Sequence, residues 1–289
     1  MNITESPRRL VIKPQSPFVD WWDRNKGDFT KWTLIAVVVA YVAFLIVAPI
    51  AGLAVGALKQ GLGKAIASLN HPEVFLAFWN TIWISLVVVT IHAVFGTLVA
   101  WVFVRHRFPG RNLINGLVDM PFAISPVVAG YMLLLIFGRN GFLAPLIDAL
   151  GIQVAFAMPG MVLATLFVTS PFMIRELIPV LEAFDTRQEK AAATLGANGW
   201  QTFWRVTFPA LRWGMIYGIT LTFARALGEF GAVLVIGGGV QGRTETATLF
   251  IYRALDERQY IGAYSAALLL GLFSLILVLG SDWLRRRRQ

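Results

Sequence analysis

The stretch that decides the fold is WTLIAVVVAYVAFLIVAPIAGLAVGAL, Trp32–Leu58, which carries no Asp, Glu, Lys or Arg. A bilayer core about 30 Å thick is crossed by about 20 helical residues, so this run is long enough to span a membrane. Further apolar runs follow it and together predict six membrane-spanning helices in an all-α, polytopic protein. Their approximate bounds are Trp32–Leu58, Val74–Val104, Leu113–Gly138, Pro159–Ala183, Ala210–Gly238 and Tyr260–Leu284.

The composition and the short motifs argue against an enzyme. Of the 289 residues, 57% are apolar and 14% are charged, whereas about a quarter of residues are charged in soluble domains. The chain has no cysteine and three histidines, and it shows no catalytic triad or paired-carboxylate pattern. Gly63-Lys64 lacks the first glycine and the hydroxyl of a nucleotide-binding P-loop. We therefore expect no catalytic residue, metal or cofactor in this chain.

One glycine-rich segment has the spacing of a dinucleotide-binding loop, G-x-G-x-x-G, at Gly237, Gly239 and Gly242. It follows a predicted membrane helix and opens no strand-turn-helix unit, which dinucleotide binding requires. We interpret it as a flexible loop.

The basic residues predict how the chain crosses the membrane. Lys and Arg in short loops are retained on the cytoplasmic side, and most of the 25 lie at one set of span ends. That set includes an N-terminal tail, residues 1–31, and a basic C-terminal tail, residues 285–289. We therefore predict an inner-membrane protein with both termini in the cytoplasm. The net charge of +9 is spread over these ends, which fits contact with membrane lipid and not with nucleic acid.

The connection between the fourth and fifth predicted spans, residues 184–209, has helical composition and is long enough to protrude. Asp185-Thr186 supplies N-cap chemistry and Gly196 a stop, so Arg187–Leu195 is predicted to be a helix. A second short helix follows, with apolar side chains at helical spacing at Trp200, Phe203, Trp204 and Val206. Such a hairpin either inserts into a groove on a partner protein or lies on lipid headgroups.

The same loop resembles a signature of ABC importer permeases, EAA---G---------I-LP. The matching residues are Lys190-Ala191-Ala192, Gly196, Val206, Phe208 and Pro209. The resemblance implies that the loop docks on a separate ATP-hydrolysing subunit, through Glu189, Lys190, Ala191, Ala192, Gly196, Trp200, Val206 and Pro209. One position departs from the family, because Lys190 stands where the signature has Glu, and Glu189 precedes it.

Three further segments resemble the permeases of sulfate/thiosulfate ABC importers, the first in the form of their W-type subunit. They are PFAISPVVAG (Pro121–Gly130), PFMIREL (Pro171–Leu177) and ARALGEFGA (Ala224–Ala232). The resemblance implies a type I ABC importer permease core, MetI-like, with five helices over residues 74–284 and residues 184–209 as its cytoplasmic coupling loop. Molybdate and tungstate permeases share much of the Gly228–Gly231 pattern, so transport of those oxyanions is an alternative.

The partners implied by the resemblance complete a transporter. A second, similar permease subunit of T type would share the translocation pathway, and two ATPase subunits, which carry ATP and magnesium, would grip the coupling loops. An extracytoplasmic sulfate/thiosulfate-binding protein would deliver the substrate, and ATP-driven closure would switch the cavity between outward and inward access. Two other functions remain open: a membrane-integral enzyme, and a membrane anchor that docks a cytosolic partner without transport.

Ionisable residues inside the predicted spans are candidates for the pathway, because charges at membrane depth are costly and face protein or water. Arg225 lies near the middle of the fifth span with Glu229 one turn further on, and Arg175 lies nearer the cytoplasmic end of the fourth. These groups either neutralise one another, as Arg225 with Glu229 or as a cross pair with Arg175, or present positive potential to a passing dianion. Asp119 lies too near the cytoplasmic end of its span to be included.

A proline pair in the third span adds one more candidate. Pro121 and Pro126 flank Ser125, and each proline removes a helical hydrogen bond. The segment therefore either supplies free backbone groups to a gate or pore wall, or is a kink in a lipid-facing helix. Ser125 accordingly joins the predicted pathway residues.

Overall fold

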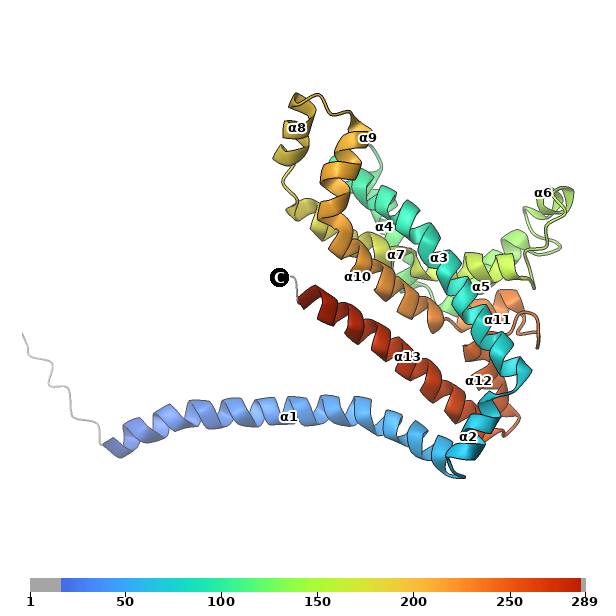
Figure 1. The fold of residues 1–289 in the computed structure, drawn as a ribbon, viewed down its shortest axis with the longest axis horizontal. Coiled ribbons are helices and arrows are strands. Elements are labelled where there is room, and N and C mark those ends of the chain that lie inside the picture. The colour runs from blue at the N-terminus through green and yellow to red at the C-terminus, as the bar shows by residue number, and fades with distance from the viewer. Residues whose placement is uncertain (1–16, 287–289) are drawn as a thin grey trace, which may run out of the picture. The chain divides into compact units, whose positions relative to one another are not determined.

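The computed structural model describes residues 17–286, and the side chains of residues 30–283 (Figure 1). Within these ranges the chain forms helices and connecting turns, with no strand, as predicted. It divides into two units, Met1–Gly52 and Leu53–Gln289, with the boundary inside the first predicted span. Residues 17–31 of the predicted N-terminal tail belong to the same helix as the first span, whereas residues 1–16 and 287–289 lie outside the described residues.

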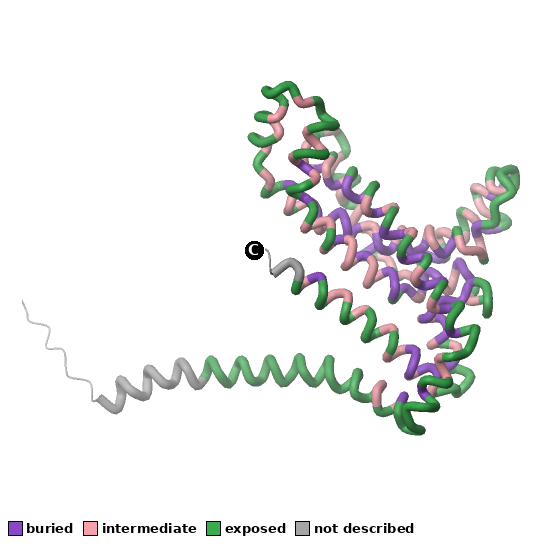
Figure 2. Tube along the Cα trace, viewed as in Figure 1, coloured by how far each residue is buried: buried purple, intermediate pink, exposed green. Residues whose placement is uncertain are grey.

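Helix α1, Pro17–Leu58, supplies all of the described structure of the first unit. From Thr30 to Gly52 every residue is exposed (Figure 2). The segment Thr30–Leu58 has a mean hydropathy of 2.8, and none of its most apolar window is buried by protein. An apolar helix without a protein cover fits a lipid environment, so the first predicted span is a helix of membrane-spanning length.

The second unit is a helical bundle, with α8 and α9 at one end and α2 and α12 at the other (Figure 1). After the end of α1 its elements are α2 (Leu62–Leu69), α3 (Pro72–Arg105), α4 (Arg111–Ala123), α5 (Pro126–Phe137), α6 (Ala144–Ala149), α7 (Met158–Ala183), α8 (Arg187–Thr194), α9 (Gly199–Thr202), the π-helical turn η1 (Phe203–Thr207), α10 (Phe208–Leu227), α11 (Gly231–Gly237), α12 (Ala247–Asp256) and α13 (Tyr260–Arg286).

Helices α3, α7 and α10 pack against one another at the centre of this bundle (Figure 2). Their shared core contains the buried side chains of Ala100, Phe103, Met173, Leu177 and Leu211. His92 makes polar contacts across the α3–α7 interface, where its Nε2 lies 3.0 Å from Thr169 Oγ1 and 3.2 Å from Leu166 O. Packing and interhelical hydrogen bonds of this kind hold helices together in a bilayer, where lipid offers no hydrophobic drive for association.

The third and fifth predicted spans are not straight helices. α4 and α5 meet at 115°, and α10 and α11 meet at 58°. At the first break, Pro126 has no amide proton to continue the helix, and Ser125 before it adopts φ −58° and ψ 136°. At the second break, Gly228 ends α10 and Phe230 precedes α11 with φ −128°. The proline pattern therefore marks a sharp turn of the chain and not a mild kink.

The two broken helices fit closely because glycine stands where α5 meets α11. A Cβ on Gly130 would lie 2.8 Å from Ala232 O, and one on Gly231 would lie 3.2 Å from Val127 N. A side chain at either position would therefore force the helices apart.

The number of spans agrees with the sequence if each bent pair crosses once. Among the described residues, four helices are long and apolar enough to span: α1 from Thr30, α3, α7 and α13. The two bent pairs raise the count to as many as six. The short helices α2, α6 and α12 lie in the connections between spans and were not predicted.

The loop at the glycine pattern contains side-chain hydrogen bonds, and its flexibility stays a prediction. Thr244 Oγ1 donates to Gly237 O at 2.6 Å and accepts a hydrogen bond from Val240 N at 3.0 Å. The glycines serve backbone geometry, because Gly239 and Gly242 both have positive φ, at 58° and 71°. The segment is a hydrogen-bonded turn that leads from α11 to α12.

Candidate functional site

The predicted hairpin, residues 184–209, is present and consists of α8, α9 and η1 (Figure 1). Asp185 Oδ1 accepts a hydrogen bond from Arg187 N at 2.9 Å and so caps α8, as the sequence predicted. A capping box between Asn198 and Gln201 starts α9. Both helices therefore begin at fixed positions, and the hairpin has a defined shape.

Gly196 makes the turn between the two helices. Its φ is +85°, its amide donates to Ala193 O at 3.0 Å, and the Ala197 amide donates to Ala192 O at 3.0 Å. This pair of bonds is a Schellman motif, which requires a left-handed residue at the glycine position. The predicted stop is thus the residue on which the hairpin geometry depends.

Glu189 ties the hairpin to the rest of the bundle. Its Oε1 lies 3.3 Å from Arg105 Nη2 at the end of α3 and accepts a hydrogen bond from Thr207 Oγ1 at 2.8 Å. The Arg105 and Glu189 side chains are only 13% and 21% exposed. Lys190, in contrast, is exposed. Glu189 therefore makes its contacts within the chain, and Lys190 is the residue available to a partner.

The hairpin presents apolar and aromatic side chains to its surroundings. Leu195, Trp200 and Trp204 are 88%, 71% and 46% exposed. The two Trp rings meet edge to face with centroids 5.6 Å apart, and Phe203 packs against both. Tryptophans exposed in this way are typical of protein interfaces. The other predicted docking residues are exposed or partly buried: Ala191, Ala192, Val206 and Pro209.

Arg225 and Glu229 lie together at the break between α10 and α11. Arg225 Nη1 is 2.9 Å from Glu229 Oε2, without the alignment of a hydrogen bond, so the attraction is ionic. Glu229 Oε1 accepts a hydrogen bond from Ala232 N at 3.2 Å, in the first turn of α11. The Glu229 side chain is 2% exposed and that of Arg225 is 30% exposed. The two charges are paired, which is one of the two predicted arrangements, and the Arg225 side chain stays partly exposed.

Arg175 does not join this pair, so the predicted cross pair is wrong. Its Nε and Nη2 bind the carboxylate of Asp119 on α4 at 2.7 and 2.5 Å, and Nη2 also donates to Asn115 O. Asp119, which was not predicted to take part, pairs with Arg175 because α4 packs against α7. Ser125 lies exposed at the bend itself.

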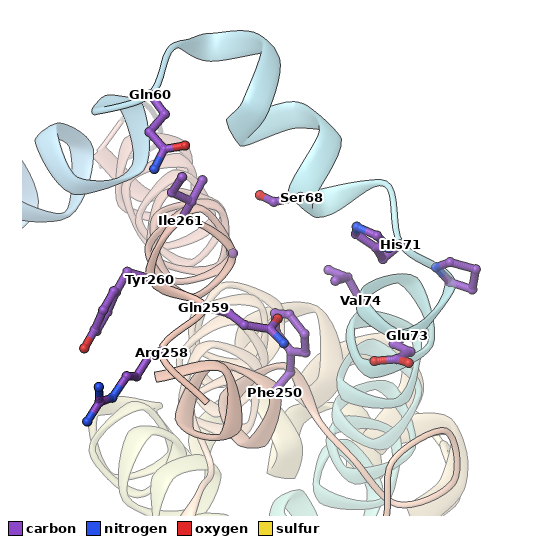
Figure 3. A pocket seen from close by; sticks show the side chains of 12 residues that line it. Gln60, Ser68, His71, Glu73, Val74, Phe250, Arg258, Gln259, Tyr260 and Ile261 are labelled. Atoms are coloured by element: carbon purple, nitrogen blue, oxygen red, sulfur yellow. The ribbon is translucent and has the colours of Figure 1, made fainter. Parts of the chain in front are cut away.

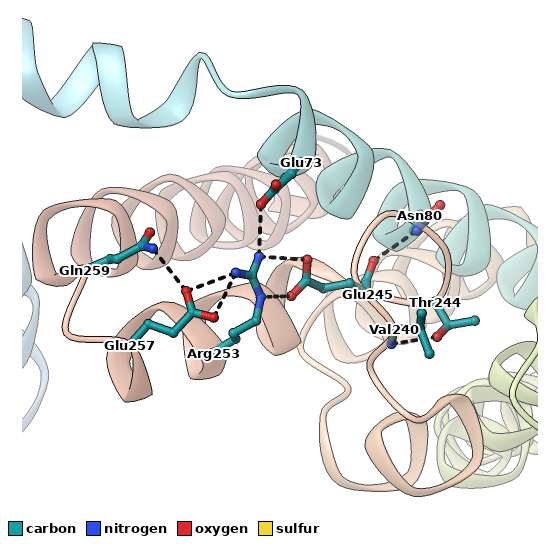
Figure 4. A network of polar contacts seen from close by, with 8 residues as sticks. All are labelled: Glu73, Asn80, Val240, Thr244, Glu245, Arg253, Glu257 and Gln259. Atoms are coloured by element: carbon teal, nitrogen blue, oxygen red, sulfur yellow. Dashed lines mark hydrogen bonds and ion pairs between the residues drawn. The ribbon is translucent and has the colours of Figure 1, made fainter.

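A second polar cluster, which the sequence did not reveal, lies at the end of the bundle that carries α12 (Figure 4). Arg253 binds three carboxylates: Glu245 at 2.6 Å, Glu257 at 3.1 Å and Glu73 at 3.3 Å. The bonds to Glu245 raise the pKa of Arg253 above its ordinary value, so the favourable contribution of the pair is present throughout the neutral range. Glu257 is one helical turn from Arg253, but Glu73 is 180 residues away, so no local motif indicates the complete cluster.

A cavity of about 590 Å³ opens at the same end of the bundle (Figure 3). His71 and Val74 line one side, and the connection from Gln259 to Ile261 lines the other. Among the described residues, no group of three or more His, Asp or Glu side chains could hold a metal ion. The cavity contains none of the predicted site residues.

Comparisons with known proteins identify the family of the chain. Residues 92–289 match the family described as "Binding-protein-dependent transport system inner membrane component". The chain belongs to this family. As a member of the binding-protein-dependent permeases, it is a multi-pass membrane protein.

Several relatives of this permease carry sulfate transport in their names. The chain is 48% identical over 243 residues to "Sulfate transport system permease protein CysW" of Synechococcus elongatus, with 84% of this chain and 85% of the relative covered. It is 43% identical to the CysW protein of Escherichia coli K12, covering 88% of each chain, and 35% identical to the CysT protein of that strain, covering 86% and 89%.

A solved structure with the same fold supports the assignment of the helices. A bacterial ABC transporter involved in the import of alginate matches with a TM-score of 0.76 and 17% identity, covering 93% of this chain and 99% of that chain. At this identity the likeness concerns the fold alone. The type I importer permease fold predicted from the motifs is confirmed.

The internal role of Glu189 leads to a prediction for the permease. Glu189→Ala removes an ion pair and a hydrogen bond that fix α8, so amide hydrogen exchange over residues 187–195 should become about tenfold faster. Lys190→Ala is the matched control, since the neighbouring side chain is exposed. Equal exchange rates in Glu189→Ala and the unsubstituted protein would show that the Arg105 and Thr207 contacts do not hold the hairpin.

Proposed function

We propose that this permease is the W-type transmembrane subunit of an ATP-driven importer of sulfate, with thiosulfate as a second substrate. The observation that carries the proposal is the 41–48% identity to CysW proteins over most of the chain. The broken spans support it, because they place a buried glutamate and a partly exposed arginine at the same break. The chain itself makes and breaks no covalent bond.

The hairpin is the proposed contact with the ATPase. Its aromatic surface around Trp200 and Trp204 fits an apolar groove, and the exposed Lys190 adds a positive charge at the rim. We propose that one of two ATPase subunits, which bind ATP and magnesium, holds this hairpin, and that the second holds the equivalent hairpin of a T-type permease subunit. Glu189 then passes the movement of the hairpin to α3 through Arg105.

The orientation follows from the same proposal. If the hairpin faces the cytoplasm, the basic tails do so as well, and α2 and α12 face outward, where a sulfate/thiosulfate-binding protein delivers the ion. The distribution of Lys and Arg supports this topology in the inner membrane. The Arg253 cluster and the cavity beside α2 then lie on the extracytoplasmic side.

The proposed pathway residue is Arg225. Its side chain is 30% exposed although it is paired, so it can attract a dianion while Glu229 limits the strength of binding. Weak binding suits transit, because an ion must leave the site as well as enter it. Ser125 at the neighbouring break is the second candidate. Arg175 is the third, but its ion pair with Asp119 favours a structural role at the α4–α7 contact over a role in the pathway.

The test is uptake of labelled sulfate by cells that lack this chain. We expect uptake to fall to background and to return with the intact gene, and excess unlabelled thiosulfate to compete in the complemented strain while molybdate does not. Unchanged sulfate uptake combined with lost molybdate uptake would support the alternative, a molybdate or tungstate permease. Unchanged uptake of both ions would favour a membrane anchor without a transport function.

A further inference from the structure

Helix α12 contacts the break that carries the Arg225–Glu229 pair. Thr248 Oγ1 donates a hydrogen bond to the backbone oxygen of Glu229 at 2.7 Å. Four residues later along α12, the Tyr252 ring packs on Phe230, with centroids 5.3 Å apart. Two successive turns of α12 therefore hold Glu229 and Phe230, two of the three residues that connect α10 to α11.

The same helix is fastened to α3. The Ala247 amide, in the first turn of α12, donates to Thr81 Oγ1 at 2.8 Å, and Asn80 Nδ2 donates to Glu245 O at 2.9 Å. At the far end of α12, Arg253 binds Glu73 at the start of α3 and the buried Glu245 (Figure 4). Helix α12 is thus bound to α3 at both ends.

We propose that α12 is a strut that positions Arg225 for the passing anion, with Thr248 and Arg253 as positioning residues. The strut fixes the backbone of Glu229, and the Glu229 carboxylate fixes the guanidinium of Arg225 at 2.9 Å. A shift of α12 therefore moves the charge in the pathway without altering the hairpin at the other end of the bundle. This inference rests on the proposed function, since it assigns to α12 a part in sulfate transit.

The decisive readout is the number of sulfate ions imported per ATP hydrolysed. A change that only reduces the amount of folded importer lowers uptake and ATP hydrolysis together and leaves their ratio unchanged. Loss of the strut lowers uptake while the hairpin still drives ATP hydrolysis, so the ratio falls. The measurement uses the complete importer, with its ATPase, second permease subunit and binding protein, reconstituted in lipid vesicles with labelled sulfate.

Thr248→Val is the test variant, because it keeps the shape of the side chain and removes the hydrogen-bond donor to Glu229. One such bond is expected to change the ratio by about fivefold. Thr248→Ser keeps the hydroxyl and is the matched control, with the ratio of the unsubstituted importer. An unchanged ratio in Thr248→Val would overturn the strut, whereas absence of sulfate uptake by the unsubstituted importer would overturn the proposed function.

A second variant tests whether the Arg253 cluster acts through the same strut. Arg253→Gln should lower the ratio, and its combination with Thr248→Val should lower it no further, because both changes release the same element. Should Arg253→Gln fail to assemble, Glu257→Gln, which removes a 42%-exposed partner and spares the buried Glu245, takes its place with a smaller expected fall. Fold-changes that multiply in the double variant would show two independent effects and refute the link.

Discussion

Replacement of Gly196 by proline is expected to abolish sulfate uptake while the membrane-spanning helices remain folded. Proline fixes φ near −65° and has no amide proton, whereas Gly196 has φ +85° and donates to Ala193 O. Loss of the Schellman motif should destabilise the docking conformation of the hairpin by about 3 kcal/mol. About one molecule in a hundred then has that conformation. Uptake, and ATPase activity that depends on the assembled importer, should therefore fall about a hundredfold.

The fold is expected to survive because Gly196 is exposed and a Cβ there would meet nothing within 4 Å. Gly196→Asn is the matched control, since asparagine adopts the left-handed conformation and keeps the amide. It should retain uptake within about fivefold of the unsubstituted importer. The measurements are sulfate uptake in vesicles and co-purification of the ATPase subunit. Normal ATPase co-purification with Gly196→Pro would refute the hairpin as the docking element.

The helical architecture and the hairpin were predictable because their signals are local. Apolar runs of spanning length identify the four continuous spans and the two that are bent in the described part of the chain, without reference to any other segment. The stop at Gly196 and the cap at Asp185 depend on residues within one turn, so the sequence shows both donor and acceptor. The bend angle at Ser125 was harder to predict from the sequence. Proline predicts an interruption of the helix, but the packing of α5 against α11 sets the angle of the bend.

The polar contacts between distant segments were only partly predictable. Arg225 and Glu229 are one helical turn apart, so their pairing could be read from spacing. Arg175 and Asp119 are 56 residues apart and meet only because α4 folds back against α7. Arg253 and Glu73 are separated by 180 residues, and no pattern along the chain indicates their contact. Topology, and not local chemistry, decides such pairs.

The charges at the break between α10 and α11 allow a structural role to be separated from a role in transport. Arg225→Gln leaves the carboxylate of Glu229, 2% exposed, without its partner, which should destabilise the permease by about 3 kcal/mol. Glu229→Gln leaves the less buried Arg225 side chain without its partner, and it should destabilise the permease by a smaller amount. Thermal unfolding of the purified permease in detergent gives both values.

The double substitution Arg225→Gln and Glu229→Gln is the discriminating variant. Two neutral amides of similar volume replace the ion pair, so stability should return to within about 1 kcal/mol of the unsubstituted permease. Sulfate uptake should nevertheless stay at least tenfold below normal, because no positive charge then faces the anion at the break. Recovery of both uptake and stability would show that the ion pair only stabilises the packing of the helices. Ser125 and the opposite permease subunit would then remain as candidates for the pathway.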